Sequence, residues 1–359
     1  MSKYVDLRDI IIIAPNFKQR LSGVTSTIIQ LIPEQRKLGQ KIATLGPGLP
    51  DHLPSVRFID LWRLWQKPQG ANTRVWHSRR NVEMLAGIVL RDVLQMKLNL
   101  IFTSAAQRRH KRYTRWLISK MDKVITTTDK AASYLDYPST TIHHGVDLQR
   151  FKPCDDKKNL KVQLDLDPNT KLLGCFGRVR HQKGTDLFVE MLLDILPQHP
   201  KWAGVITGRI TADNSAFADK LKAKIKTAGL SERIIFAGEV DDVTDWFRAI
   251  DIYIAPQRWE GFGLTPLEAA ACGVPSIATD VGAFSEIITP GKTGEIVEIE
   301  DLVRMITYTQ DIMNDDQKRQ SYGKNARLRA EQHFALEHEA TKIGEIYNKF
   351  NTQNGLKTV

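Results

Sequence analysis

The sequence predicts an α/β protein built from two Rossmann-like, doubly wound domains that face each other across a cleft. Its 359 residues exceed what one hydrophobic core usually serves, so two domains are expected. Short apolar, β-rich runs alternate with helical stretches, a pattern typical of parallel sheets covered by helices. We expect a first domain at 1–160, a second at 161–335, and a helical segment at 336–359 that packs back toward the first.

The expected strands fall into two series. The first series is Ile10–Ala14, Ile42–Leu45, Val56–Asp60, Leu100–Phe102, Lys123–Thr127 and Thr141–His143. A polar stretch from Cys154 to Lys161 reads as a linker, and a second series follows: Lys171–Phe176, Gly204–Thr207, Ile234–Ala237, Asp251–Ala255 and Pro275–Thr279. From Leu302 onward the sequence indicates amphipathic helices. Ligands of doubly wound sheets bind at the carboxyl ends of the strands, so motifs that follow strands carry the functional argument.

Composition limits the classes of protein. The chain has 42% hydrophobic residues and three cysteines that form no CxxC pair and no zinc-ligand spacing, which favours a reducing compartment. The apolar run near the N-terminus is too short for a signal peptide, and no run approaches the ~18 residues of a membrane-spanning helix. We expect a cytoplasmic protein that touches a membrane only from its surface.

Charge is divided unevenly along the chain. Residues 1–165 hold 28 Lys and Arg against 14 Asp and Glu, whereas residues 166–359 hold 23 against 27. The densest basic run, Arg108 to Trp116, mixes cations with aromatic residues as single-strand nucleic-acid binders do. Apolar residues at helical spacing continue the run, which equally fits a helix with a solvated basic face. Docking on anionic lipid head groups or on a phosphorylated acceptor stays open as a third reading.

The first motif is LLGCFGRVRHQKGTDLF, a strand followed by a turn and a helix that begins near Thr185. Arg178 and Lys183 lie on the turn before the helix N-terminus, where backbone N–H groups already favour an anion. Two cations there suit a diphosphate, although two surface cations beside a strand end are the alternative. The motif is neither a dinucleotide fingerprint nor a Walker A loop.

The second motif is EGFGLTPLE, which follows the strand DIYIAP and opens a helix. Glu260 precedes the glycines and Glu268 lies in the first helical turn. Gly261 and Gly263 let the backbone N–H groups of the turn approach a ligand closely. Carboxylates accept hydrogen bonds from hydroxyls, so two acids around an anion-binding turn indicate a ligand with hydroxyls at each end and phosphate between. That ligand is a nucleotide sugar; singly, either acid could be an ordinary surface or helix-capping residue.

These segments, with AGEVDDVTDWFRAIDIYIAP and EGFGLTPLEAAACGVPSIATDVGAFSEII, resemble the nucleotide-binding domain of the retaining GT-B glycosyltransferases of family 4. The resemblance covers residues 165–300 well and the first half more loosely, through LSGVTSTIIQL and HHGVDLQRFKP. It implies that Arg178 and Lys183 bind the diphosphate, that Glu268 binds the ribose and that Glu260 positions the transferred sugar. It further implies donor contacts from these residues: Gly23, Glu239, Val240, Gly261, Phe262, Gly263, Leu264 and Thr265.

The chain departs from the family at two places. Many members have a histidine at the end of a strand where this chain has IFTSAA, and His77 of VWHSRRN is a nearby candidate for a donor or acceptor contact. An Asn-Gly-Val-Asp turn is changed to begin with His144, which we interpret as structural, together with His143. Neither change removes the phosphate or sugar contacts.

The overall run of the chain is similar to lipopolysaccharide-core mannosyltransferases of Gram-negative bacteria, which implies GDP-mannose as donor and an anionic Kdo–lipid A acceptor. Such an acceptor at the inner-membrane surface would explain the basic first half, and no nucleic-acid partner is then expected. The residues expected to meet it are His77, Arg79, Arg80, Arg108, Arg109, Lys111 and Arg112.

No cofactor and no metal are expected, because no Asp-x-Asp motif or His/Asp cluster is recognised in the sequence. Arg178 and Lys183 would then stabilise the leaving diphosphate. The resemblance implies retention, in which the departing phosphate oxygen takes the acceptor proton, and a nucleophilic role for Glu260 stays open. The alternatives are a UDP-sugar transferase acting on another glycan, an epimerase or phosphorylase of the same fold, and a non-enzymatic basic binder of membranes or nucleic acid.

Overall fold

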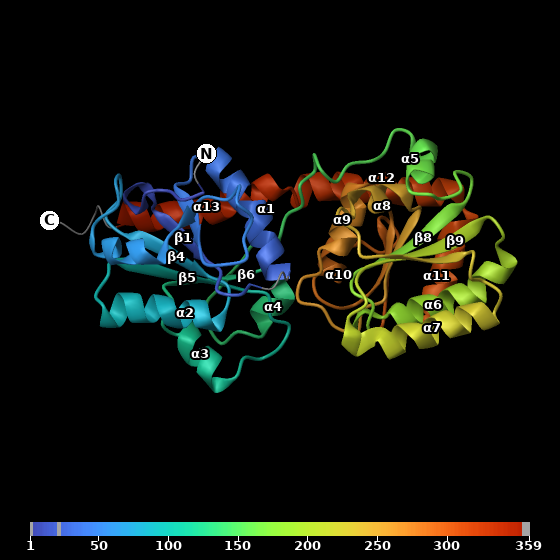
Figure 1. The fold of residues 1–359 in the computed structure, drawn as a ribbon, viewed down its shortest axis with the longest axis horizontal. Coiled ribbons are helices and arrows are strands. Elements are labelled where there is room, and N and C mark those ends of the chain that lie inside the picture. The colour runs from blue at the N-terminus through green and yellow to red at the C-terminus, as the bar shows by residue number, and fades with distance from the viewer. Residues whose placement is uncertain (1–2, 20–22, 354–359) are drawn as a thin grey trace. The chain divides into compact units, whose positions relative to one another are not determined.

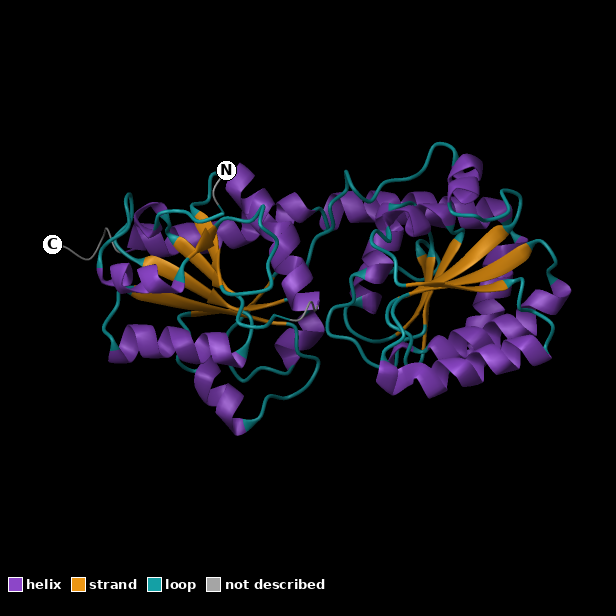
Figure 2. Ribbon diagram, in the orientation of Figure 1, coloured by secondary structure: helices purple, strands orange, loops and turns teal. Residues whose placement is uncertain are grey.

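The computed structural model describes residues 3–19 and 23–353, which form two compact α/β units (Figures 1 and 2). The first unit comprises Met1–Gly145 and Leu336–Val359, and the second comprises Val146–Ala335. The chain therefore changes unit after Gly145, earlier than the expected residue 160. Its C-terminal segment, from Leu336, is part of the first unit.

The first unit is built on a seven-stranded, all-parallel sheet in the order β3-β2-β1-β4-β5-β6-β7. The strands are β1 (Ile12–Pro15), β2 (Ile42–Leu45), β3 (Ser55–Val56), β4 (Arg74–Ser78), β5 (Leu98–Ser104), β6 (Lys123–Thr126) and β7 (Thr140–Thr141). Starting from β1, the sheet grows first toward β3 and then, on the other side, toward β7. This reversal of direction is the doubly wound arrangement that the sequence predicts.

Two parts of this sheet differ from the expected strands. The central strand β4 was missed, because the buried Arg74 in its first position is unusual for a strand interior. Its guanidinium donates to the backbone carbonyls of Leu7, Ile10 and Gln66, which replace the water it loses. The expected strand Val56–Asp60 is wrong beyond Val56, because the chain turns into a 3₁₀ helix, η2 (Phe58–Trp65).

Helices cover both faces of the first sheet. One face packs on α1 (Gly23–Lys37) and α13 (Leu336–Gln353), through strand residues such as Ile12 and Val75. The other face packs on α2 (Asn81–Ile88) and α3 (Arg112–Ile118), through residues such as Ile13 and Trp76. A short π-helical segment, η3 (Val89–Val93), continues α2, and α4 (Asp129–Ser133) follows β6. Alternate residues of each strand thus enter opposite cores, as strand geometry requires.

The second unit has a six-stranded parallel sheet in the order β10-β9-β8-β11-β12-β13. The strands are β8 (Lys171–Phe176), β9 (Trp202–Thr207), β10 (Ile234–Gly238), β11 (Ile252–Ala255), β12 (Ser276–Thr279) and β13 (Gly294–Val297). This order equals the Rossmann order, with the switch point between β8 and β11. The turns that follow these two neighbouring strands hold the two sequence motifs.

The helices of the second unit also form two layers. One core contains α8 (Thr244–Ala249), α9 (Thr265–Ala271) and α10 (Phe284–Ile287), with part of α12 (Asp316–His333). The other contains α6 (Thr185–Ile195), α7 (Ser215–Thr227) and α11 (Leu302–Asn314). No helix in the described part of the chain has the length and apolar content needed to cross a membrane.

The polar stretch expected to be a linker is instead a helix of the second unit, α5 (Lys157–Gln163). Asp156 caps it by accepting from the Asn159 amide, and Leu160 is buried. Two lysines of α5 reach one carboxylate: Lys157 Nζ lies 3.2 Å and Lys161 Nζ 3.3 Å from oxygens of Asp251. These two cations outweigh the burial of Asp251 and hold the pKa of its carboxyl below the ordinary value. Charge pairing therefore fixes a segment whose composition suggests a loop.

The C-terminal helix α13 is held to the first unit by buried polar contacts. Glu339 accepts from the backbone N–H of Gly145 at 2.8 Å, and its second oxygen lies 2.8 Å from His144 Nδ1. Farther along α13, the Tyr347 hydroxyl lies 2.6 Å from His77 Nδ1. The helix thus closes the unit at the point where the chain leaves it.

Glu339→Ala should lower the free energy of unfolding by about 1–3 kcal/mol, because it leaves the Gly145 amide and the His144 ring without their buried partner. Urea unfolding followed by circular dichroism measures this change. Glu337→Ala, at an exposed position of the same helix, is the matched control and should be nearly neutral. Equal midpoints for the two variants would contradict the anchoring role of Glu339.

Candidate active site

The turn after β8 carries the first pair of cations. Gly177 has a φ of +132° and turns the chain away from the sheet, so that Arg178 follows at a half-buried position. Within the described residues, the Arg178 side chain makes no hydrogen bond or ion pair with the protein. A guanidinium that is partly withdrawn from water and has no protein partner is available to an anionic ligand.

The same turn brings Lys183 against the loop that follows β11. Gly184, at a φ of +69°, precedes α6, and a Cβ there would lie only 1.9 Å from the carbonyl oxygen of Pro256. Glycine is therefore required for this close approach of the two chain segments. Lys183 then forms an ion pair with Glu260, and both side chains are 20% exposed. The two sequence motifs meet in this pair.

Glu260 is held in place from several sides. Its second carboxylate oxygen accepts from the Gly261 amide at 3.1 Å. A Cβ on Gly263 would lie 2.3 Å from the Phe284 ring and 2.7 Å from Glu260 Cγ, and Gly263 has a φ of +83°. Gly263 thus makes room for the glutamate itself, a packing role beyond the ligand approach expected from sequence.

The backbone after Glu260 offers unused donors. Gly263 has a positive φ, and Leu264 has helical angles of −71° and −23°. In the described structure neither amide donates to a protein acceptor. Successive N–H groups in such alternating conformations form a concavity that binds anions. Phe262, by contrast, has its side chain buried in the core, so only its backbone is available at the site.

Glu268 lies in the first turn of α9, which begins at Thr265 with Pro266 in the next position. It is half-buried, and among the described residues its carboxylate accepts no hydrogen bond. Burial raises the pKa of this carboxyl to about 7; the Arg150 cation opposes the shift and Asp242 adds to it. Arg150 is itself engaged with Asp242 at 3.0 Å, so it compensates Glu268 only in part.

Glu239 and Val240, expected to contact the donor, follow β10 of the same sheet. Glu239 is exposed, and its Oε2 lies 3.8 Å from Arg209 Nε, whereas Val240 is half-buried. Both therefore lie at the carboxyl end of the sheet, like the turns after β8 and β11. The structure thus gathers the expected donor residues of the second unit at one edge.

In the first unit, Gly23 begins α1, and a Cβ there would have no heavy atom within 4 Å. Leu21 and Ser22, which precede it in the LSGVTST motif, lie outside the described residues. The exposed cations Arg108, Arg109, Lys111 and Arg112 form no ion pair in the described structure. They stand at and before the start of α3 as a solvated basic surface.

His77 is not placed as expected. It is fully buried in β4, with Nδ1 2.6 Å from the Tyr347 hydroxyl and Nε2 2.7 Å from the Thr103 hydroxyl. Burial lowers the pKa of His77 well below its ordinary value, and Arg79 adds to this effect. Both ring nitrogens are thus occupied inside the unit, and the expected contact of His77 with a donor or acceptor is wrong for this geometry.

Arg80 and Arg79 differ from each other in their surroundings. Arg80 donates to Asn16, Thr25 and Glu83, so it braces three elements of its own unit rather than presenting a free cation. Its expected role toward the acceptor has no support in these contacts. Arg79 is half-buried, and its Nη1 is a buried atom that has no hydrogen-bond partner in the described structure, so this nitrogen is not presented to a ligand from solvent.

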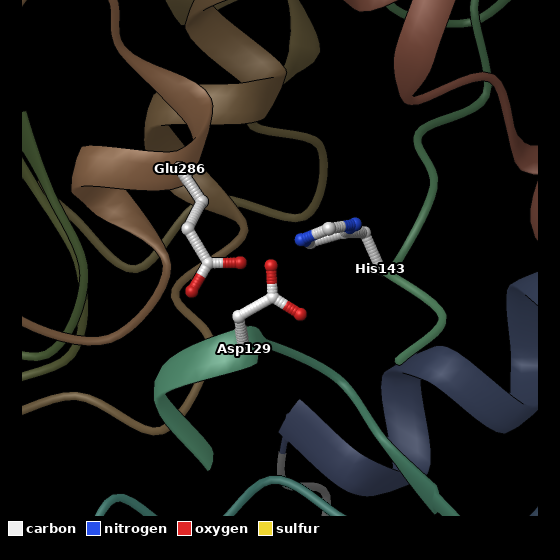
Figure 3. A group of neighbouring side chains, drawn as sticks. All are labelled: Asp129, His143 and Glu286. Carbon is white, nitrogen blue, oxygen red and sulfur yellow. The ribbon is translucent and has the colours of Figure 1, made fainter. Parts of the chain in front are cut away.

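A pair that sequence reasoning missed lies at the ends of β6 and β7. Figure 3 shows Asp129, at the start of α4, and His143, which follows β7, with their side chains directed toward one another; it also draws Glu286 of the second unit. The carboxylate oxygen of Asp129 and the ring nitrogen of His143 that could bind a metal lie within 4.8 Å of each other. His143 was interpreted as structural, although its place after a strand was a signal.

Comparison with known proteins gives consistent matches. The model of the family "Glycosyl transferases group 1" matches residues 156–329. The chain is 56% identical over 345 residues to "Lipopolysaccharide core biosynthesis mannosyltransferase LpsB" of Rhizobium meliloti (strain 1021), covering 96% of this chain and 98% of that protein. It is 52% identical over 349 residues to the corresponding LpcC of Rhizobium leguminosarum bv. viciae, covering 97% and 99%.

A solved structure agrees in fold. The crystal structure of Anabaena HepE in complex with UDP and glucose has a TM-score of 0.81 and 17% identity, and the match covers 94% of this chain and 99% of that chain. At this identity the likeness concerns the arrangement of the backbone alone.

The raised pKa of Glu268 predicts a specific dependence of stability on pH. Between the ordinary value of 4.5 and about 7, the folded state keeps a proton that the unfolded state has lost. Stability should therefore fall as pH rises through this window. Glu268→Gln removes the titrating group, so its free energy of unfolding relative to the wild type should increase from pH 5 to pH 8.

Urea unfolding at several pH values measures this difference. Glu232→Gln, at an exposed site of the same unit, is the control and should follow the wild type at every pH. If the free energies of unfolding of the wild type and Glu268→Gln varied in parallel with pH, burial would not raise the pKa of this carboxyl group.

Proposed function

Since this chain belongs to the glycosyl transferases group 1 family, we propose that it transfers mannose from GDP-mannose to an anionic lipopolysaccharide-core acceptor of the Kdo–lipid A type. Transfer proceeds with retention of the anomeric configuration and without a metal ion. The observation that carries the proposal is the Lys183–Glu260 pair, flanked by Arg178 and by the free amides of Gly263 and Leu264. The relatives' names support mannose as the sugar and the lipopolysaccharide core as the pathway.

The diphosphate of the donor lies at the turn after β8. Arg178 has no partner among the described residues and Lys183 shares its charge with one carboxylate, so both cations can turn to phosphate oxygens. The amides of Gly263 and Leu264 add neutral donors at fixed positions. Together these groups stabilise the charge that grows on the leaving diphosphate, without reorganising during the reaction.

The two acids hold the ends of the donor. Glu268 accepts hydrogen bonds from the ribose hydroxyls, which supply the donors that its carboxylate lacks in the protein. Glu260 accepts hydrogen bonds from the sugar while Lys183 and the Gly261 amide fix its orientation. Since these contacts are made through hydroxyls, they position the sugar and leave its anomeric carbon open to the acceptor.

In the transfer step, the bond from the anomeric carbon to the β-phosphate oxygen breaks and the bond to the acceptor oxygen forms on the same face. The departing phosphate oxygen takes the proton of the acceptor hydroxyl, and GDP leaves. No protein base is needed for this balance, and Glu260 acts as a positioning carboxylate. Proton NMR of the product tests retention, since an inverted glycoside would exclude this route.

The acceptor is anionic in this proposal, and the first unit offers a matching charge. Arg108, Arg109, Lys111 and Arg112 are exposed and form no ion pairs in the described structure. Phosphate and carboxylate groups of the acceptor would bind there, next to the cytoplasmic surface of the inner membrane. Nucleic acid is not the partner in this reading.

The donor is tested by thermal shift with GDP-mannose, UDP-glucose, UDP-galactose and UDP-N-acetylglucosamine. GDP-mannose should raise the melting temperature most, because a ligand that binds only the folded state stabilises it more the more tightly it binds. Stabilisation by a UDP-sugar and none by GDP-mannose would exclude the proposed donor while leaving the family assignment intact.

Lys183→Ala should lower kcat by about 10²–10³-fold, because it removes one of the charges that stabilise the leaving diphosphate. Transfer of radiolabelled mannose to extracted core acceptor measures the rate. Lys224→Ala breaks another lysine–glutamate pair, with Glu190 on the surface of the same unit, and should keep full activity. A fully active Lys183→Ala variant would remove the diphosphate role of Lys183.

A further inference from the structure

The first unit exposes an unusual aromatic segment on η2. Phe58, Ile59, Trp62 and Trp65 are 54%, 76%, 52% and 54% exposed, although η2 is anchored through the buried Leu64. We call these four residues the aromatic ridge. Single exposed apolar residues are ordinary, but four within eight positions form a patch of the kind that marks an interaction site.

A second apolar feature runs along α2 and η3. Val82, Leu85, Val89 and Val93 are 51%, 38%, 40% and 69% exposed, and they recur at intervals of three and four residues. This spacing places them on one side of the continuous helical segment, facing solvent. We call them the aliphatic stripe. An amphipathic surface helix normally points such a stripe at the core, so its outward direction calls for another partner.

The ridge and the stripe adjoin. Trp65 Nε1 donates a 2.7 Å hydrogen bond to the carbonyl of Leu94, the residue that follows η3 and is itself 40% exposed. The indole is thereby fixed at the junction, with its polar atom satisfied and its ring partly in solvent. The two features therefore meet at Trp65 and Leu94, and we call them together the apolar face of the first unit.

Unpaired cations lie near this apolar face. Lys67 and Lys97 are exposed, follow Trp65 and Leu94 by two and three positions in the chain, and make no ion pair in the described structure. The helix α3, which packs against α2, adds Lys111 and Arg112 together with the exposed, stacked rings of Tyr113 and Trp116. Exposed apolar residues with unpaired cations nearby match an anionic lipid surface.

We infer that the apolar face enters the head-group region of an anionic bilayer, with the aromatic ridge and aliphatic stripe among the lipids and the flanking cations at the phosphates. Tryptophan prefers this interfacial depth, because its ring is apolar while its N–H is polar. A second copy of the same face is a poorer occupant, since a two-fold contact would bring like cations together. The physiological reason for docking rests on the proposed glycolipid acceptor, but the vesicle test below does not.

The test measures binding of the purified full chain to vesicles that contain no glycolipid and no donor. Sedimentation with vesicles of phosphatidylcholine and phosphatidylglycerol in equal parts should carry the wild type down, and phosphatidylcholine alone should do so less. The double variant Ile59→Ser/Trp62→Ser should lower the partition coefficient about tenfold or more, because both side chains lose their burial among lipids.

The matched control replaces two equally exposed apolar residues of the second unit, Val303→Ser/Val162→Ser, at 75% and 55% exposure. It should bind vesicles like the wild type, and both double variants should keep the wild-type melting temperature. Unchanged vesicle binding by Ile59→Ser/Trp62→Ser would overturn the inference. So would a wild-type dimer that this variant converts to a monomer in light scattering, because a second copy would then cover the face.

Transfer activity separates this inference from the proposed function. On a water-soluble, delipidated core acceptor the Ile59→Ser/Trp62→Ser variant should equal the wild type, whereas on acceptor embedded in vesicles its rate should fall with its binding. Loss of transfer to both acceptors would place the face in the acceptor site and would overturn the inference. Vesicle binding by a wild type that transfers no mannose would leave the docking face standing while the proposed function fails.

Discussion

The functional site depends on one constraint of the second sheet, the direct pairing of β8 with β11. Their register, with Tyr253 opposite Gly174, brings the two following turns together although Lys183 and Glu260 are 77 positions apart. Gly184 then allows the backbone to meet the Pro256 carbonyl at a distance that any side chain would prevent. The ion pair is a consequence of this packing, and it sets the position of the acid around which the rest of the site is arranged.

The strands and turns on which the site is built could be predicted from the sequence, because each is determined by residues that lie close together in the chain. A strand, a glycine turn and a helix start are each encoded within a few residues, and parallel strands place such turns at one edge. The prediction of a glycosyltransferase with two Rossmann-like domains of the GT-B type is confirmed by the family match and by the two parallel sheets. The glycine at 263 was expected to admit a ligand, yet its nearest neighbours are Phe284 and Glu260, a packing role visible only in three dimensions.

Sequence-based predictions failed where the structure depends on contacts between residues that are distant in the sequence. His77 follows a pattern that fits a ligand-binding histidine, but Tyr347, 270 residues later, occupies one of its nitrogens. Arg74 could not be recognised as an interior strand residue, because the carbonyls that satisfy it come from two other segments, at Leu7 to Ile10 and at Gln66. The polar composition of α5 suggested a linker, but its lysines are held by the carboxylate of Asp251 and by the carbonyls of Ile250 and Thr170. The sequence shows that these side chains are polar, but it does not show which groups will form hydrogen bonds or ion pairs with them.

The two acids of the site are unequal, and this inequality bears on their roles. Glu260 has a cation and a backbone amide as partners, so its charge is stabilised before any ligand arrives. Glu268 is half-buried and accepts no hydrogen bond from the described residues, and its raised pKa reflects the free energy that its ionisation costs. If the only role of this position were to begin α9, an exposed residue or one with a hydrogen-bond partner would serve as well. A carboxylate kept in an unfavourable environment is therefore best explained by donors that come from outside the protein, and a pair of adjacent hydroxyls on a ribose supplies two of them in the geometry that a carboxylate accepts.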